Sequence, residues 1–247
     1  MIVAIDGPAA SGKSSTARWV AERLGYRHVD SGALYRALTL LALRELGTSG
    51  GWDEPQVAAL GARVRLAPAA AGFDPAIDGE PAGDAVRTVE VTRHVSSVAQ
   101  MPTVREWVNA RVREAAVEHD VVADGRDIGT VVFPHAPLKV FLVADPWERA
   151  RRRLIQRLGR HPADDEIADE TEALVERDAR DATQTVQARD AVLLDTTYLT
   201  QPEQVDRIVA LARAQERLQE RARDRAGTAG SVTLPLGSFD ETSGSVT

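Results

Sequence analysis

The stretch from Gly7 to Ser14, which reads Gly-Pro-Ala-Ala-Ser-Gly-Lys-Ser, has the residue types and the spacing of a phosphate-binding loop. It fits the pattern G-x-x-x-x-G-K-[ST], follows a short apolar run and precedes a helical pattern, which is the context that this motif requires. Glycines let backbone N–H groups curl around phosphate oxygens, and the N-terminus of the next helix adds partial positive charge. An idle glycine-rich turn is the alternative. The predicted triphosphate site consists of Gly7, Pro8, Ala9, Ala10, Ser11, Gly12, Lys13, Ser14 and Ser15.

Two polar side chains of this loop and one carboxylate elsewhere predict a magnesium-nucleotide site. We expect Lys13 to reach the β- and γ-phosphates and the Ser14 hydroxyl to join the Mg²⁺ shell. Asp124 follows three apolar residues at a predicted strand end, so it resembles a carboxylate that acts on Mg²⁺ through water; a plain cap of the strand end is the alternative. The histidines show no metal-ligand spacing, and we expect all five to be structural or surface residues. They are His28, His94, His119, His135 and His161.

The phosphate loop alone indicates nucleotide binding and leaves the class of protein open. GTPases typically read guanine with an Asn-Lys-x-Asp segment, and Asn109 is the only asparagine in the chain, which disfavours a GTPase. DNA-dependent ATPases of this type are usually longer or more basic than a chain of 247 residues with a formal net charge of −7. An acidic balance also disfavours nucleic acid as a partner. A kinase for a small molecule is the class that these exclusions leave.

Arginines supply almost all of the positive charge. Only two lysines occur, Lys13 and Lys139, and every other Lys or Arg position holds an arginine. A kinase must hold two polyanions head to head, so it needs arginines from several parts of the chain to neutralise the crowded charge. Each arginine taken alone is most often a solvated surface charge. The candidates are Arg36, Arg87, Arg105, Arg126, the cluster from Arg149 to Arg157, Arg177 and Arg180.

Short apolar runs alternate with helical patterns along the chain, which is typical of a parallel sheet covered by helices on both faces. The predicted fold class is therefore α/β, a P-loop three-layer α/β/α arrangement around a central parallel sheet. Strands are expected at 2–6, 28–30, 121–124, 139–143 and 192–195. Helices are expected at 14–24, 34–46, 54–63, 88–119 with a break at Pro102, 146–158, 165–180 and 202–225.

Composition suggests a division of the chain. Residues 64–87 contain short β-rich runs with several Pro and Gly, which predicts a small β insert of the acceptor-binding region. Residues 1–63 and 88–225 form the predicted core, within which the stretch of about 149–169, rich in arginine and then broken by Gly and Pro, predicts a helical lid. From 226 to 247 the Gly, Ser and Thr content rises and periodicity fades, which predicts a flexible tail.

Several segments together carry a resemblance to a known family. They read Ile5-Asp6-Gly7-Pro8, Asp30-Ser31-Gly32-Ala33-Leu34-Tyr35-Arg36, Asp124-Gly125-Arg126-Asp127-Ile128-Gly129-Thr130-Val131-Val132-Phe133-Pro134 and Arg177-Asp178-Ala179-Arg180-Asp181. In these segments the chain resembles the bacterial cytidylate kinases, a branch of the nucleoside monophosphate kinases, from about residue 2 to about residue 215. The resemblance implies transfer of the γ-phosphoryl group of ATP to CMP or dCMP with Mg²⁺, giving ADP and CDP or dCDP.

The resemblance also implies roles for individual residues. Arg126 matches an arginine that clamps the acceptor phosphate, and Asp127 a carboxylate that accepts from the exocyclic amino group of cytosine. Uracil offers a carbonyl there, so a buried carboxylate penalises UMP. The implied CMP-binding residues are Ser31, Arg36, Ser96, Arg105, Arg126, Asp127, Arg177, Arg180 and Asp181. The implied catalytic groups are Lys13, Arg126, Arg153, Arg157 and Arg177, of which Arg153 and Arg157 come from the lid and close over the transferring group.

Simpler interpretations of the same residues stay open at this point. Ser31 has the position of a helix N-cap. Ser96 and Arg105 read equally as polar residues on a helix surface. Arg177 and Asp181 have the spacing of an i,i+4 ion pair, and the lid arginines that of solvated helical charge. The alternative functions are a P-loop kinase for another small acceptor, such as UMP, AMP or shikimate, and a nucleotide-sensing ATPase.

Two residues depart from the pattern of the family. Ala182 and Gln184 stand where many relatives have Ser and Arg. Glutamine can donate a hydrogen bond but carries no charge, so we expect one phosphate contact of the usual pattern to be weakened or lost. The reaction should survive, because Arg36, Arg126, Arg177 and Arg180 remain.

Location and partners follow from what the sequence lacks. The N-terminus has no basic region of a signal peptide, and no stretch approaches the roughly 20 apolar residues of a membrane span. Cysteine is absent, which permits a reducing compartment and excludes thiolate chemistry. We therefore expect a cytoplasmic protein that acts on small nucleotides, with neither nucleic acid nor membrane as a partner. A monomer is expected, since no apolar dimer stripe is evident.

Overall fold

The computed structural model describes residues 1–48 and 51–229, and side chains as far as 225. Its centre is an eight-stranded sheet with the order β3-β4-β2-β6-β1-β7-β8, with β5 paired to β4. The five strands β2, β6, β1, β7 and β8 run parallel to one another. These strands are β1 (Ile2–Asp6), β2 (Arg27–Asp30), β6 (Val121–Gly125), β7 (Leu138–Val143) and β8 (Val192–Asp195). The predicted α/β class with a central parallel sheet is confirmed.

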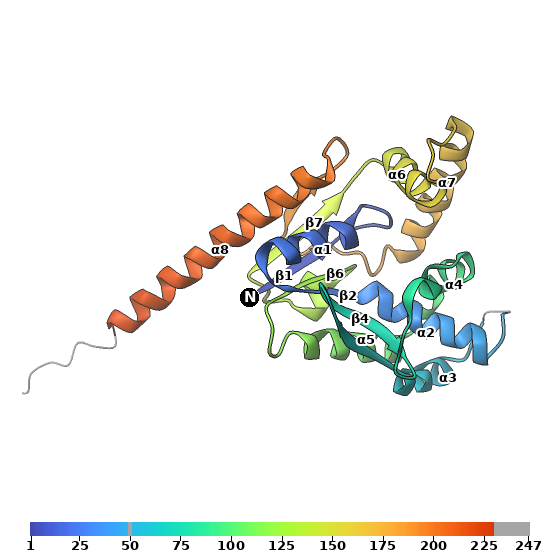
Figure 1. The fold of residues 1–247 in the computed structure, drawn as a ribbon, viewed down its shortest axis with the longest axis horizontal. Helices are drawn as coiled ribbons and strands as arrows, with labels where there is room; N and C mark the ends of the chain where they lie inside the picture. The colour runs from blue at the N-terminus through green and yellow to red at the C-terminus, as the bar shows by residue number, and fades with distance from the viewer. Residues whose placement is uncertain (49–50, 230–247) are drawn as a thin grey trace, which may run out of the picture.

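Helices cover both faces of this sheet, as Figure 1 shows. Alternate residues of one strand face opposite layers, so Val3 and Ile5 of β1 pack with α1 and α8, whereas Ala4 packs with α2, α4 and α5. Both faces of the strands are therefore buried, which explains their nearly continuous apolar runs. The covering helices are α1 (Lys13–Leu24), α2 (Ser31–Glu45), α4 (Val89–Ala99), α5 (Pro102–Ala115) and α8 (Gln201–Ala229), and the short α3 (Glu54–Ala59) packs on α5.

The β-rich segment expected at 64–87 extends the central sheet. It contains β3 (Val64–Ala69), β4 (Gly72–Ile77), β5 (Glu80–Pro81) and the 3-10 turn η2 (Gly83–Arg87), and the 3-10 turn η1 (Leu60–Arg63) precedes it. The strands β3 and β4 form an antiparallel hairpin, and β4 also pairs in parallel with β2. Gly72 lies against the backbone of His28, where a Cβ atom would stand 2.2 Å from the His28 carbonyl oxygen. The glycine therefore permits the hairpin to join the sheet.

Two helices at one end of the molecule form the segment predicted as a lid. They are α6 (Pro146–Leu158) and α7 (Asp164–Asp181), which lie side by side in Figure 1. Asp145 caps α6 by accepting from the N–H groups of Trp147 and Glu148, and Gly159 ends it in the left-handed conformation with φ 66°. The boundaries of core, insert and lid remain predictions, because pairing within one sheet does not define separate units.

The last helix extends beyond the residue at which the sequence pattern ends. Helix α8 continues to Ala229 and projects away from the body of the protein, on the side opposite α6 and α7 (Figure 1). The predicted flexible tail begins at 226, so its first residues are helical in the structure, and residues 230–247 lie outside the described part. Within the described residues, no helix is both long and apolar enough to cross a membrane.

Candidate active site

The phosphate loop leads from β1 into α1 and is shaped by residues that permit unusual backbone angles. Gly12 is the N-cap of α1 with φ 88°, and Gly7 has φ 149°. A Cβ atom on Gly7 would lie 2.2 Å from the carbonyl oxygen of Leu142, so only glycine fits there. Lys13 Nζ donates to the Pro8 carbonyl at 2.5 Å and is buried. Burial, with the charge of Arg126, lowers the pKa of Lys13 well below its usual value.

A chain of hydrogen bonds connects the loop to the end of β6. Ser14 Oγ donates to Asp124 Oδ2 at 2.6 Å, and His28 Nε2 lies 2.8 Å from Asp124 Oδ1. Burial favours the protonated acid, but the hydrogen bonds from His28 and Ser14 outweigh it, and the pKa of Asp124 lies below its ordinary value. Asp124 is therefore an anionic carboxylate in contact with the loop hydroxyl, and His28 is buried against its other oxygen.

These oxygens fit the expected magnesium ion. Mg²⁺ takes hard oxygen ligands, is usually held by one or two carboxylates together with substrate phosphates, and keeps several waters. Among the described residues no group of three or more His, Cys, Asp or Glu could hold a metal by itself. The hydroxyl of Ser14 and the carboxylate of Asp124 thus suit an ion that arrives with the triphosphate.

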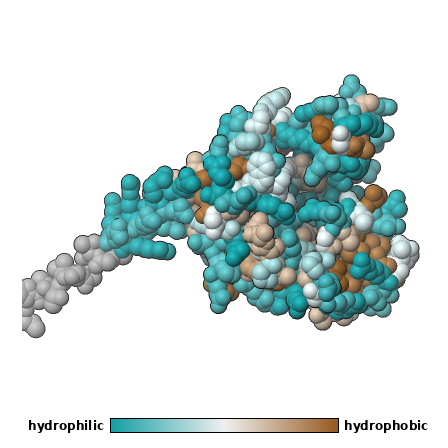
Figure 2. All heavy atoms as spheres, viewed as in Figure 1, coloured by the Kyte–Doolittle hydropathy of each residue, from teal (hydrophilic) through white to brown (hydrophobic). Residues whose placement is uncertain are grey.

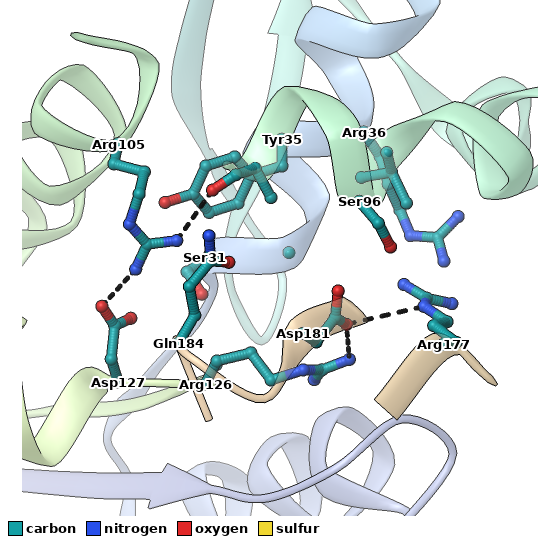
Figure 3. Close-up of a pocket in the computed structure, with 14 residues that line it drawn as sticks. Ser31, Tyr35, Arg36, Ser96, Arg105, Arg126, Asp127, Arg177, Asp181 and Gln184 are labelled. Atoms are coloured by element: carbon teal, nitrogen blue, oxygen red, sulfur yellow. Dashed lines mark hydrogen bonds and ion pairs between the residues drawn. The ribbon is translucent and has the colours of Figure 1, made fainter. Parts of the chain in front are cut away.

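A second site lies at the carboxyl ends of the parallel strands, where open α/β sheets bind ligands. Figure 3 shows its side chains converging from α2, α4, α5, α7 and the loop after β6. The lining residues are Ser31, Gly32, Tyr35, Arg36, Val95, Ser96, Ala99, Arg105, Gly125, Arg126, Asp127, Arg177, Asp181 and Gln184. We call this the acceptor pocket. Eight of the nine CMP-binding residues predicted from the sequence meet in it.

One end of the acceptor pocket holds a single carboxylate. Asp127 is buried and forms an ion pair with Arg105, whose Nη1 also donates to the Ala99 carbonyl at 2.9 Å. The guanidinium carbon of Arg105 lies 5.9 Å from the ring centre of Tyr35. This end can therefore accept from an amino group and donate to a carbonyl on a flat, partly apolar ligand.

The other end of the pocket concentrates positive charge. Arg126 Nη2 and Arg177 Nε lie 3.4 and 3.7 Å from Asp181 Oδ2, so two guanidinium groups share one carboxylate (Figure 3). Arg36 Nη1 donates to Thr92 Oγ1 at 2.9 Å. Burial first, and the charge of neighbouring arginines second, lower the pKa of Arg177 to about 10. Burial also lowers the pKa of Arg36 to about 10. An excess of buried cations is a ready site for a phosphate group.

The structure decides between interpretations that the sequence leaves open. Asp30, rather than Ser31, is the N-cap of α2, because its side chain accepts from the N–H of Ala33. Ser31 Oγ instead donates to the Asp124 carbonyl at 2.8 Å and faces the acceptor pocket. The pair of Arg177 and Asp181 is more than an i,i+4 contact, since Asp181 also holds Arg126.

The predicted lid arginines differ in their surroundings. Arg153 and Arg157 both pair with Glu170, at 3.1 and 3.0 Å. The charge of Arg153, whose side chain is mostly buried, contributes to the lowered pKa values of Arg36 and Arg177, whereas the side chain of Arg157 is half exposed. Arg180 is exposed and does not line the pocket; its carbonyl accepts from Gln100 Nε2 at 3.2 Å.

Sequence reasoning missed the role of Asp6. Its two carboxylate oxygens accept from the N–H groups of Ile128 and Gly129, both at 2.8 Å, and so fix the π turn η3 (Ile128–Val132) that follows Asp127. Burial raises the pKa of Asp6 to about 6. The signal was present, because Asp6 ends an apolar strand directly before the phosphate loop, as Asp124 ends β6. Asp6 therefore connects the phosphate loop to the end of the acceptor pocket that holds Asp127.

The two sites adjoin each other, since Asp124 accepts from Ser14 of the phosphate loop through its carboxylate and from Ser31 of the acceptor pocket through its backbone carbonyl. Two neighbouring anion sites on a parallel sheet, one made by a phosphate loop and one by arginines, define a P-loop kinase as the class of protein.

Comparison with known proteins gives the family. The model of the cytidylate kinase family matches residues 3–214, and the chain belongs to this family. The chain is 46% identical over 210 residues to a cytidylate kinase of Thermus thermophilus, covering 85% of this chain and 97% of that one. It is 44% identical over 213 residues to a cytidylate kinase of Limosilactobacillus fermentum, covering 83% and 92%.

Proposed function

We propose that this protein transfers the γ-phosphoryl group of ATP to CMP or dCMP, giving ADP and CDP or dCDP. The observation that carries the proposal is the acceptor pocket, in which a buried carboxylate stands at one end and an excess of arginine at the other. A cytidine monophosphate has the matching polarity, with an amino group on its base and a phosphate at the opposite end. Membership of the cytidylate kinase family supports the same substrate.

The transfer needs positioning and charge rather than a base. A phosphate oxygen of the acceptor is already an anionic nucleophile; it forms the new bond to the γ-phosphorus while the bond from that phosphorus to the β–γ bridging oxygen breaks. Arg36, Arg126 and Arg177 hold the acceptor phosphate, and Lys13 turns from the Pro8 carbonyl to the β- and γ-phosphates. Arg153 adds charge from the lid. Mg²⁺ bound beside Ser14 and Asp124 would neutralise charge on the triphosphate.

Base selection rests on Asp127. Its carboxylate accepts from the exocyclic amino group of cytosine, while Arg105 and Ser96 serve the remaining edge of the ring. Uracil places a carbonyl at the amino position, so two acceptors face each other and a buried charge is left without a partner. This arrangement disfavours UMP as the acceptor. It equally disfavours shikimate, which has no base to fill that end.

The first test is ADP formation by the purified protein with ATP and Mg²⁺ and one acceptor at a time. We expect rapid ADP release with CMP and dCMP, little with UMP, AMP, GMP or shikimate, and none when EDTA removes Mg²⁺. A rate that does not depend on the acceptor would contradict the proposal and favour the nucleotide-sensing ATPase.

A variant tests the base reader. Asp127→Asn removes the charge and leaves one acceptor oxygen for two donors, Arg105 and the amino group of cytosine, so kcat/KM for CMP should fall about 100-fold, as expected when a hydrogen bond to a buried charge is lost. The preference for CMP over UMP should narrow by a similar factor. Asp84→Asn, at an exposed position far along the chain, is the matched control. An unchanged CMP to UMP ratio in Asp127→Asn would assign base selection elsewhere.

The cytoplasmic location and the monomeric state expected from the sequence belong to this proposal as well. Small nucleotides are the proposed partners. The acidic balance of the chain disfavours a polyanionic partner such as nucleic acid.

A further inference from the structure

Side chains from the two lid helices bind the backbone N–H and the backbone carbonyl of one phosphate-loop residue, Ala9. The N–H of Ala9 donates to Asp178 Oδ1 at 3.0 Å, and the carbonyl of Ala9 accepts from Arg149 Nη1 at 2.8 Å. Arg149 Nη1 and Asp178 Oδ2 are themselves 2.6 Å apart. The side chain of Arg149 is only 4% exposed. The loop, α6 and α7 therefore meet at the backbone of Ala9.

Apolar packing joins the same three parts. A small core, separate from the two that flank the sheet, consists of Ala9, Ala150, Leu154, Ile167 and Leu174, and Ala10 packs against it. Ala10 has φ 56°, a left-handed conformation that is unfavourable for a residue with a Cβ atom and persists where its surroundings over-determine it. The lid helices supply those surroundings.

The same helices carry the groups that face the acceptor phosphate. Asp178 directly follows Arg177, which lines the acceptor pocket together with Asp181. Arg149 stands one helical turn before Arg153, whose charge reaches Arg36 and Arg177. The contacts of Ala9 thus fix the direction from which α6 and α7 present their arginines.

Stability alone does not account for this ion pair. Replacing a buried ion pair by apolar residues of similar volume is often neutral or stabilising, and the surroundings of Arg149 already include the apolar side chains of Ala150 and Leu154. What an apolar pair cannot supply is a directional hold on the N–H and the carbonyl of Ala9. The contribution of Arg149 and Asp178 is therefore the pair of directional hydrogen bonds that orient the backbone of Ala9.

We propose that Arg149 and Asp178 are positioning residues that couple the two nucleotide sites. A triphosphate that fixes the conformation of the phosphate loop also fixes the position of Ala9. Through its contact with Asp178, Ala9 then sets the position of Arg177 over the acceptor pocket. By linkage, the acceptor favours binding of the triphosphate by the same factor. This inference rests on the proposed function of the same site.

The coupling is measured as a ratio of dissociation constants. Isothermal titration calorimetry gives the Kd of CMP alone and in the presence of Mg²⁺ and a non-hydrolysable ATP analogue. For the wild-type protein we expect the analogue to tighten CMP about tenfold, within the usual range of coupling between sites. Asp178→Asn leaves one oxygen for two donors, so the ratio should fall below about twofold while the Kd of CMP alone changes less than about threefold.

A matched control lies in the loop between the same two helices. Arg160 pairs with Glu166 at 2.6 Å on the exposed side of the lid, and Arg160→Gln should keep the wild-type ratio. A purely structural role of Asp178 would lower the melting temperature and weaken both nucleotides alike, which leaves the ratio unmoved. The ratio therefore separates positioning from folding.

A second variant guards against loss of folding. Arg149→Lys keeps the charge, but its shorter side chain does not reach the position of Nη1, the one atom that contacts both Ala9 and Asp178, so its ratio should also fall. A ratio of one in the wild-type protein would contradict the coupling. So would a folded variant, either Asp178→Asn or Arg149→Lys, that keeps the ratio of the wild-type protein. Failure of the proposed function is distinguishable, because it appears as a wild-type protein whose ADP release does not depend on CMP.

Discussion

At the scale of single residues, the acceptor pocket is short of negative charge. Arg36, Arg126 and Arg177 approach one another around the single carboxylate of Asp181, and burial with mutual repulsion lowers the pKa values of Arg36 and Arg177 to about 10. Repulsion of this kind is relieved when a dianionic phosphate enters. The nucleotide-free protein is therefore expected to gain stability from CMP beyond what contact area alone gives.

Gln184 is the residue at which the effect of the excess positive charge in the acceptor pocket can be tested. It lines the acceptor pocket beside the arginines, where a family pattern expects another arginine. Gln184→Arg should tighten CMP about tenfold, through a charge-assisted hydrogen bond to its phosphate. It should also lower the melting temperature of the nucleotide-free protein by a few degrees, because a further cation joins the cluster.

Calorimetric titration and thermal melts measure the two effects. Gln187→Arg, three residues further and exposed, is the control and should change neither quantity. If Gln184→Arg left the affinity for CMP unchanged, the side chain at this position would not face the acceptor phosphate.

Asp6 gives the stability a dependence on pH. Burial raises its pKa from 3.8 to about 6, so the folded protein binds this proton more tightly than the unfolded chain. The resulting stability is fully present below about pH 4 and is lost as the pH rises through 6, a change of about 3 kcal/mol. Asp6→Asn cannot titrate. The free energy of unfolding of the wild type, relative to this variant, should therefore fall by that amount between pH 4 and 7.

Denaturant unfolding at several pH values measures this difference. The variant also loses one hydrogen bond to η3, which lowers its free energy of unfolding by the same amount at every pH. The decisive quantity is therefore the slope of the free energy of unfolding against pH. Asp84→Asn, at an exposed site, should follow the wild-type profile. Parallel profiles for the wild type and Asp6→Asn would show that Asp6 is charged throughout this range.

At the scale of elements, the position of the β3–β4 hairpin depends on one missing side chain. Gly72 lies so close to the backbone of His28 that a Cβ atom would meet its carbonyl oxygen at 2.2 Å. Gly72→Ala must push β4 away from β2, whose end leads into Ser31 and the acceptor pocket. We expect a loss of about 3 kcal/mol or more, typical of overpacking against backbone, and a raised KM for CMP.

The control for this change is on the same strand. Asp74 is exposed, and Asp74→Ala should change the free energy of unfolding by less than about 0.5 kcal/mol. Urea denaturation of both variants makes the comparison. Equal stability of Gly72→Ala and the wild type would mean that β4 does not pair with β2 in solution.

Elements were predictable from the sequence where the signal is local. The strands at 2–6, 121–124 and 192–195 are apolar runs, the break at Pro102 separates α4 from α5, and Gly159 ends α6. What could not be predicted depends on partners far along the chain. The pairing of β4 with β2 and the contacts of η3 with Asp6 are of this kind.

The same limit applies to the site. The phosphate loop and the loop after β6 can be recognised by their sequence motifs. Eight of the nine predicted CMP-binding residues meet in one pocket. The burial of Arg149 and the exposure of Arg180 could not be predicted, because the sequence pattern around a helical arginine is the same whether its side chain is buried or exposed. Arg149 proves to be buried on the phosphate loop, and Arg180 proves to be exposed.

At the scale of the whole molecule, α8 has two halves with different roles. Its first half is part of the core, with Val205, Ile208, Val209 and Ala212 buried against β1, β7 and α1. None of the described side chains from Arg217 to Arg225 is buried, and Figure 2 shows this projecting part in the teal of hydrophilic residues. Glu216, near the middle of α8, accepts a hydrogen bond from the Tyr26 hydroxyl of the body.

Two truncations separate these halves. A chain that ends at Leu218 keeps all of the α8 side chains that are buried in the part of the helix described as far as residue 225. It should retain the wild-type rate of ADP formation, with a melting temperature within about 2 °C, because exposed helix adds little stability. A chain that ends at Gln204 loses four buried side chains. At about 1.5–3 kcal/mol for each large apolar side chain, that loss approaches the whole stability of a typical domain. It should fail to fold by circular dichroism, whereas an unfolded first truncation would show that the projecting half of α8 stabilises the body.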